Sequence, residues 1–304
     1  MIHIFTALIP IFSLIMIGYF LKKIKFPSYE FWPQADKLTY YILMPSLLIY
    51  KLSNANLKEV NSFNFVLTAL LTITIILFIL MLINKFFRAK DDAFTSVVQG
   101  GIRFNTYVFL ALADSIFGDT GLVLAVILMT FVIPFINILC ISIFALYVSE
   151  SRLTFKYLLK SIVTNPLIMA CFIGGSINYI GIEVPIIADK ILAILSSAAL
   201  PLGLLSVGFG LVIKEINSSK SEIFNSNFAK LVLTPIIMFL IAKFFELDNQ
   251  MISILVIFAV LPTAPSSFVL ARQLGGDVRL MSSIITVQTL VSVLFIIFVL
   301  NYFI

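Results

Sequence analysis

Two apolar stretches of the chain are interrupted by residues that end helices or carry polar side chains. The first interruption, at 99–106, reads QGGIRFNT and combines a glycine pair with an arginine and an asparagine. The second, at 261–267, reads LPTAPSS and has two prolines three residues apart. A proline removes an amide donor and obstructs the carbonyl four residues back. Because freed backbone groups in hydrocarbon must be satisfied by protein or water, both segments predict broken helices beside a hydrated cavity in the protein interior.

A broken helix can bind an anion. Its new N-terminus exposes unpaired amides with a partial positive charge of about +0.5, and two such ends facing one cavity favour a carboxylate. Arg103 would add a full charge and a planar fork that fits a carboxylate. The predicted contacts in these two segments are Arg103, Asn105, Thr106, Thr263, Ser266 and Ser267.

Each of these residues also has a structural interpretation. Arg103 could snorkel or pair with Asp114, and Asn105 could form an interhelical hydrogen bond without a ligand. Gly100 and Gly101 are the predicted hinge of the first interruption. Two further prolines, Pro45 and Pro201, are also predicted as hinge residues and are interpreted as kinks that serve helix packing rather than ligand contact. Three other polar residues are interpreted as packing residues: Asn137, Asn165 and Gln288.

The composition is that of a polytopic membrane protein. Of 304 residues, 61% are apolar and 12% are charged, and the mean hydropathy is +1.13. A soluble domain carries about 25% charged residues, so a soluble enzyme, a disordered chain and a disulfide scaffold are excluded. The basic residues form no dense patch, which argues against nucleic acid as a partner. His3 is the single histidine, and Cys140 and Cys171 lie in apolar runs, so we expect no histidine triad, metal site or cofactor.

Ten apolar runs are long enough to cross a bilayer core of about 30 Å as helices. They are 3–21, 35–52, 63–83, 93–116, 121–148, 157–180, 185–213, 228–245, 250–271 and 280–303. The connections after odd-numbered runs hold 15 basic residues, Lys230 among them, and those after even-numbered runs hold four. Positive residues favour the cytoplasm, so we expect both termini outside. The first run lacks a signal-peptide cleavage pattern and is expected to be retained.

A shift of 156 residues superimposes several prolines and glycines. Pro10 falls on Pro166, Gly18 on Gly174, and Pro45 on Pro201, although chance among 11 prolines and 13 glycines is the alternative. The expected halves are 1–150 and 151–304, with five spans each. Because five is odd, the second half would enter the membrane from the opposite side, as in many secondary transporters.

The acidic residues add a negative indication. All 15 lie at or near span ends or in connections, with Asp36 and Asp114 closest to the interior. A cation–proton antiporter would be expected to place carboxylates at mid-membrane. This distribution disfavours cation exchange and leaves sodium binding by backbone carbonyls open.

The chain resembles the auxin efflux carrier family in its short bacterial form. The motifs that carry the resemblance are YYILMPSLL (40–48), RFNT (103–106), NP (165–166), LPL through VG (200–208) and LPTAP through GGD (261–277). The resemblance implies an inverted five-plus-five fold like that of bile-acid sodium symporters, in which broken helices 4 and 9 cross. It also implies scaffold and transport domains with an elevator-like motion. By carry-over, Asn105 and the segment from Pro262 to Pro265 are the substrate contacts.

Two departures from the plant members stand out. The large polar loop between spans five and six is reduced here to about Glu150–Lys156, and Phe104 stands where some members have a proline before the asparagine. The family's plant members export auxin, and bacterial relatives are associated with malate, malonate and similar anions.

We therefore expect a secondary transporter of mono- or dicarboxylates such as malate or malonate, in a prokaryotic inner membrane. The alternatives are a sodium-coupled carrier of another substrate, a channel, and an intramembrane enzyme, which would need a nucleophile–base pair that the spans lack. The coupling ion (proton or sodium), the direction of transport and a homodimeric state stay open.

Overall fold

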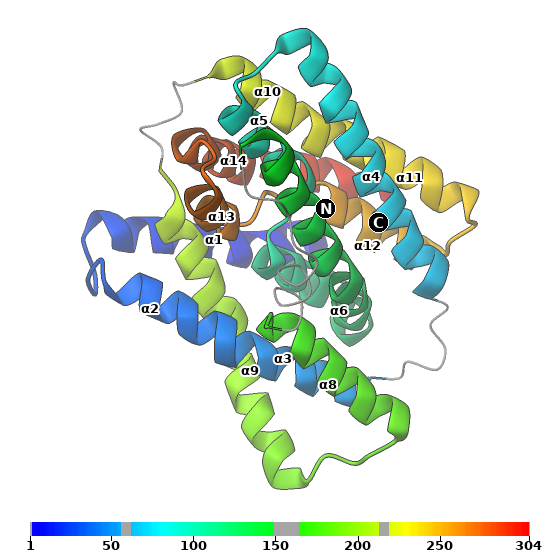
Figure 1. Cartoon of the computed structure of the whole chain (residues 1–304). Helices are drawn as coiled ribbons and strands as arrows, with labels where there is room; N and C mark the ends of the chain where they lie inside the picture. Colours follow the sequence, from blue (N-terminus) through cyan, green and yellow to red (C-terminus); the bar gives the residue numbers. More distant parts are fainter. Residues whose placement is uncertain (1, 56–61, 149–163, 213–218, 304) are drawn as a thin grey trace. The chain divides into compact units, whose positions relative to one another are not determined.

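The computed structural model describes residues 2–55, 62–148, 164–212 and 219–303 (Figure 1). These residues are helical throughout, with short connections and no strand among them. The elements are α1 (Ile2–Lys23), α2 (Phe31–Leu38), the π-helical turn η1 (Thr39–Leu43), α3 (Met44–Ser53), α4 (Ser62–Phe87), α5 (Asp91–Ile102), α6 (Thr106–Tyr147), α8 (Pro166–Ile180), α9 (Ile186–Gly210), α10 (Lys220–Phe228), the π-helical turn η4 (Ala229–Leu233), α11 (Thr234–Phe244), α12 (Asn249–Ala259), α13 (Ser266–Leu274) and α14 (Val278–Phe303).

Each of the ten expected apolar runs overlaps one of these helices or a consecutive set of them, although residues 157–163 of the sixth run and residue 213 of the seventh lie outside the described part. Six stretches of the described chain are long and apolar enough to cross a membrane, and α8 and α12 are shorter apolar helices. The prediction of an all-α polytopic membrane protein is confirmed. Within α6, Gly118 has φ 59° and ψ −150° and divides the helix, as expected from the gap between the runs 93–116 and 121–148.

Local sequence signals explain several helix ends. Asn165 caps α8 because its side-chain oxygen accepts from the amides of Leu167, at 3.0 Å, and Ile168, at 3.4 Å. Pro166 then occupies the first turn, where its missing amide costs nothing. Gly181 ends α8 with φ 75°, a left-handed conformation that glycine adopts without strain. Asn165, expected as a packing residue, is therefore a helix cap.

The chain forms two compact units. Unit 1 comprises Met1–Ser62, Leu110–Phe131 and Lys156–Gly210, and unit 2 comprises Phe63–Phe109, Val132–Phe155 and Leu211–Ile304. Each unit takes segments from both expected halves, 1–150 and 151–304. Both interruptions identified in the sequence fall in unit 2.

Unit 1 is held together by close contacts between α1 and α9 and between α3 and α8. Gly18 of α1 lies against the backbone of Leu205 in α9, so closely that a Cβ at Gly18 would collide with that carbonyl. A Cβ at Gly174 of α8 would lie 3.0 Å from the Cα of Ile49 in α3. Leu205 is 156 residues after Ile49, just as Gly174 is 156 after Gly18. The two contacts are therefore related by the same shift as the sequence matches.

The two prolines expected as kinks belong to unit 1 and lie within helical runs. Pro45 occupies the first turn of α3, directly after η1, where the Met44 amide bonds to the Thr39 carbonyl five residues back. Pro201 lies inside α9. Neither stands at one of the two interruptions.

Candidate substrate site

The first interruption separates α5 from α6. The chain leaves the helix after Ile102, runs through Arg103–Asn105, and starts α6 at Thr106. Asn105 is the N-cap of α6, because its Oδ1 accepts from the amides of Tyr107, at 3.1 Å, and Val108, at 3.2 Å. The asparagine cap thus starts a new helix directly after the break.

The glycine pair lies in the last turn of α5, just before the break, and serves close packing. A Cβ at Gly100 would overlap the Ser226 hydroxyl of α10, and one at Gly101 would lie 2.6 Å from a methyl group of Leu80 in α4. The chain remains helical through both glycines. The interruption itself begins at Arg103.

The break frees the carbonyl of Gly100, which an unbroken helix would pair with the amide of Phe104. The Thr263 hydroxyl donates to this carbonyl at 2.9 Å, and Nε2 of Gln288 in α14 donates to it at 2.9 Å. Oε1 of Gln288 accepts from the Thr263 amide at 2.9 Å. Thr263 and Gln288 are fully buried. Protein groups, rather than water, therefore satisfy this carbonyl, and Gln288 does more than pack against a neighbouring helix.

The second interruption separates α12 from α13 and is bonded to the first. Helix α12 ends at Ala259 and α13 begins at Ser266. The amide of Asn105 donates to the carbonyl of Pro262 at 2.7 Å. The two segments expected to be broken are thus both broken, and their unwound parts are joined through the main chain.

Arg103 connects the two interruptions through its side chain. It is half-buried; its Nη1 donates to Oδ1 of Asn137 at 3.2 Å and its Nη2 donates to the hydroxyl of Ser266 at 3.3 Å. The Cys140 thiol also lies against the guanidinium. Within the described ranges no carboxylate lies within 4.0 Å of Arg103, so the alternative pairing with Asp114 is not found. A guanidinium has five donors, so donors remain for an anion.

The electrostatic setting of Arg103 favours a negative ligand. Ser266 is exposed and is the first residue of α13, whose N-terminus has no side-chain cap. The guanidinium therefore stands beside the partial positive end of a helix, and the described residues supply no carboxylate to either. Two positive groups held together repel one another unless an anion joins them.

The remaining predicted contacts differ in their accessibility. Thr106 and Pro265 are half-buried at the N-termini of α6 and α13. Thr263 and Pro262 are buried; the Thr263 hydroxyl donates to the Gly100 carbonyl, and the Pro262 carbonyl accepts from the Asn105 amide. Asn105 is fully buried; its oxygen caps α6, and its Nδ2 has no hydrogen-bond partner among the described residues. The Ser267 hydroxyl is also buried and has no partner in the same part of the chain. The structure thus brings the predicted residues together, with Arg103, Ser266 and Thr106 on the accessible side.

Two expectations change. Lys230 was assigned to the connection after the seventh span, but it lies in η4, within the continuous helical stretch Lys220–Phe244, and is 1% exposed. The assignment was wrong because the helix begins at Lys220, eight residues before the apolar run at 228. The roles of Gln288 and Asn137 were missed, and their signal in the sequence was only that each is a polar residue in an apolar span.

In the described part of the chain, six stretches are long and apolar enough to cross a membrane, and two interruptions are bonded to each other beside a half-buried arginine. These are features of a membrane transport protein. Residues 3–300 match the family described as membrane transport protein. The chain therefore belongs to this family, which is the auxin efflux carrier family predicted from the motifs.

The chain is similar to two curated bacterial proteins over almost its whole length. It is 24% identical to the "Putative malonate transporter" of Rhizobium meliloti (strain 1021), over 96% of this chain and 93% of that protein. It is 23% identical to the "Uncharacterized transporter YfdV" of Escherichia coli (strain K12), over 93% of this chain and 92% of that protein.

Proposed function

We propose that the protein is a secondary transporter that moves small organic anions, such as malonate or malate, across a prokaryotic inner membrane by alternating access. The observation that carries the proposal is the position of Arg103. Its guanidinium lies at the N-terminus of α13, it joins the two interruptions, and it has no carboxylate partner among the described residues. A carboxylate group of the substrate would supply that missing negative charge.

The arrangement suits a small ligand with one or two carboxylates. One carboxylate would take the free donors of Arg103, with the Ser266 hydroxyl beside it. Thr106, half-buried at the start of α6, would donate a neutral hydrogen bond from the other interruption. The name of the Rhizobium relative, which refers to malonate, agrees with this size and charge.

The paired glycine contacts of unit 1 support an inverted repeat of five plus five helices. Gly18 on Leu205 and Gly174 on Ile49 are images of each other under the 156-residue shift, as expected where two halves exchange places about a two-fold axis. Within this architecture we propose that unit 2, which holds both interruptions, carries the substrate, that unit 1 serves as the scaffold, and that both termini lie outside.

The test is uptake by the purified protein in liposomes. Labelled malonate, malate, succinate and indole-3-acetate would be offered to vesicles preloaded with the same unlabelled compound. We expect saturable counterflow of at least one dicarboxylate. Arg103→Gln should raise KM strongly. The control is Arg272→Gln, which should leave KM unchanged because Arg272 is exposed in the last turn of α13, at the other end of that helix from Arg103. Flux that does not saturate would favour a channel, and wild-type kinetics for Arg103→Gln would refute the proposed site.

A further inference from the structure

Lys230 is the charged residue that the fold buries. It is 1% exposed, and among the residues described as buried it is the one that carries a formal charge. The structure gives its ammonium no carboxylate within 4.0 Å and no hydrogen-bond acceptor among the described residues. Its contact is the ring of Phe258 in α12, with Nζ 5.2 Å from the ring centroid. An isolated ammonium in a low-dielectric interior is costly, and releasing its proton removes that cost.

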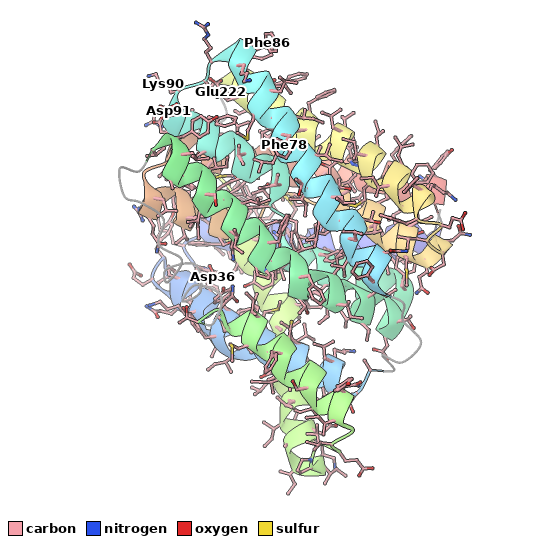
Figure 2. The ribbon with its side chains drawn as sticks, turned by 45° about the vertical axis from the view of Figure 1, so that its right-hand side comes forward. Asp36, Phe78, Phe86, Lys90, Asp91 and Glu222 are labelled. Atoms are coloured by element: carbon pink, nitrogen blue, oxygen red, sulfur yellow. The ribbon has the colours of Figure 1, made fainter. Side chains whose placement is uncertain are left out.

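A polar stripe leads from the end of the helix to this lysine. Glu222, Ser226 and Lys230 follow one another at steps of four residues along α10 and η4, so they lie on one face of the helical run. The whole stripe spans about 12 Å along the axis. Figure 2 shows Glu222 near Lys90 and Asp91, which lie at the start of α5.

The outer part of the stripe has room for water. Glu222 and its neighbours Ser221 and Asn225 line a cavity of about 20 Å³ between α4, α5 and α10. That volume holds about one water molecule. Asn84 of α4 lines the same cavity. A carboxylate and three further polar side chains thus line a cavity large enough for a water molecule, as an entrance for protons requires.

The inner part of the stripe has polar groups without partners. The Ser226 hydroxyl and both polar atoms of the Gln99 side chain are buried and make no hydrogen bond within the described residues, and Oδ1 of Asn227 is in the same situation. Gly100, next to Gln99, lies directly against Ser226. Natural proteins rarely leave several adjacent buried polar groups unpaired unless water or a proton path uses them.

Other charged groups near the stripe are confined to helix ends. On the elements packed against η4, Asp91 and Asp92 lie in the first turn of α5, and Lys243 lies in the last turn of α11. Helix α10 has Lys220 and Glu222 in its first turn. Helix α12, which supplies Phe258, has no charged residue within its bounds. Of these groups, Glu222 is the one that lies on the same helix face as Lys230.

Lys230 is linked to the first interruption through aromatic rings. The ring of Phe258 packs against Phe104, with centroids 4.6 Å apart, and against Phe109, with centroids 5.5 Å apart. Phe104 directly precedes Asn105, the cap of α6. A charged Lys230 attracts the face of the Phe258 ring, and a neutral one does not. A change in its protonation therefore acts on the rings that flank the unwound segment.

We propose that Lys230 is a proton-binding site that couples transport to the proton gradient, loaded through Glu222 and Ser226. This inference rests on the proposed function. A proton from water adds to the lone pair of the neutral Lys230 amine on one side of the membrane. The same N–H bond breaks on the other side and returns the proton to water, so one proton accompanies each transport cycle.

The first experiment compares substrate exchange with proton movement in liposomes that contain a pH-sensitive dye. The variants are Lys230→Met, which removes the amine, and Lys230→Arg, which keeps the charge but does not release its proton. The control is Lys243→Met, because Lys243 also lies over an aromatic ring, Phe239 at 5.8 Å, but is exposed. Malonate is the substrate probe.

Counterflow is measured with malonate on both sides, where inward and outward steps move equal numbers of protons. Proton entry is measured separately, during net malonate uptake into vesicles without internal malonate. We expect wild type and Lys243→Met to show counterflow in the first assay and proton entry in the second. Both Lys230 variants should retain counterflow and lose the proton entry. Proton entry by Lys230→Met, or net malonate uptake by wild type with no proton movement, would overturn the inference.

The second experiment needs no substrate. The Tm of the purified wild type, Lys230→Met and Lys243→Met is measured between about pH 6 and pH 9. The Tm difference between wild type and Lys230→Met should change with pH, whereas that of Lys243→Met should stay constant over this range. A constant difference for Lys230→Met would overturn the inference. If no carboxylate is transported but this pH dependence is present, the proposed function fails while the proton site stands.

Discussion

The contribution of the hydrogen bonds at the first interruption to the free energy of unfolding can be measured with Gln288→Met, a substitution of similar volume. Gln288 bonds to the Gly100 carbonyl through Nε2 and to the Thr263 amide through Oε1, both at 2.9 Å, and it is fully buried. Losing the bond to Gly100 costs about 1 kcal/mol, and leaving the buried Thr263 amide unpaired costs about 1–3 kcal/mol. The free energy of unfolding should therefore fall by about 2–4 kcal/mol.

Thr263→Val removes the second bond to the same carbonyl. Alone it should cost about 1 kcal/mol, because Gln288 still satisfies Gly100. In the double variant that carbonyl has no partner, so the combined loss should exceed the sum of the single losses by about 1 kcal/mol. The bonds therefore predict a coupling energy as well as two separate effects.

The assay is equilibrium unfolding in mixed detergent micelles, with counterflow as a parallel readout. The control is Thr289→Val, since Thr289 is buried next to Gln288 but bonds within its own helix, to Ile285 at 2.7 Å. If Gln288→Met costs no more than this control, or the double-variant losses are additive, the bonds do not fix the interruption in the way described.

Four further outcomes can be checked. Asn105→Ala removes the cap of α6, costing about 1 kcal/mol, and should abolish counterflow while membrane insertion remains normal by fractionation; retained transport would contradict this. Pro262→Ala should likewise abolish counterflow, because the freed amide favours a continuous helix, and normal uptake would show that the break does not depend on it. Arg103→Lys keeps the charge but loses the planar guanidinium that can bind a carboxylate through two hydrogen bonds. KM should therefore rise, about tenfold for each 1.4 kcal/mol of binding free energy lost, and an unchanged KM would refute this. Gly174→Ala should lower Tm because a Cβ crowds Ile49, whereas Gly175→Ala, with open space around it, should not; equal Tm values would argue against close helix contact.

Much of the fold follows from the order of apolar residues. Each run of about 20 residues is long enough to span a bilayer only as a helix. Where the structure describes the ten expected runs, helices fill most of each run, and the interruptions at 103–105 and 260–265 are the main exceptions. The interruptions were also predictable, since Pro262 and Pro265 break a helix by their covalent structure. At 99–106 the break was predicted from the glycine pair and the polar residues Arg103 and Asn105 within an apolar run.

The details of the first break could not be read from the sequence. Gly100 and Gly101 are typical of an unwound segment, yet they stay helical, and neighbouring side chains occupy the space that a Cβ would need. The chain unwinds three residues later because Thr263 and Gln288, more than 150 residues away in sequence, take over the carbonyl of Gly100. The position of Lys230 was also predicted wrongly. The helical stretch begins at Lys220, eight residues before the apolar run, and the apolar content of the sequence does not show this.

The bond from the Asn105 amide to the Pro262 carbonyl has a consequence for how such a protein can diversify. It joins main-chain atoms, so a mutation at position 262 leaves the acceptor in place, and any residue but proline at position 105 keeps the donor. Other side chains near the pair, such as Thr106 and Ser266, can therefore be exchanged during evolution, and the preferred substrate with them, while this main-chain bond between the two interruptions is kept.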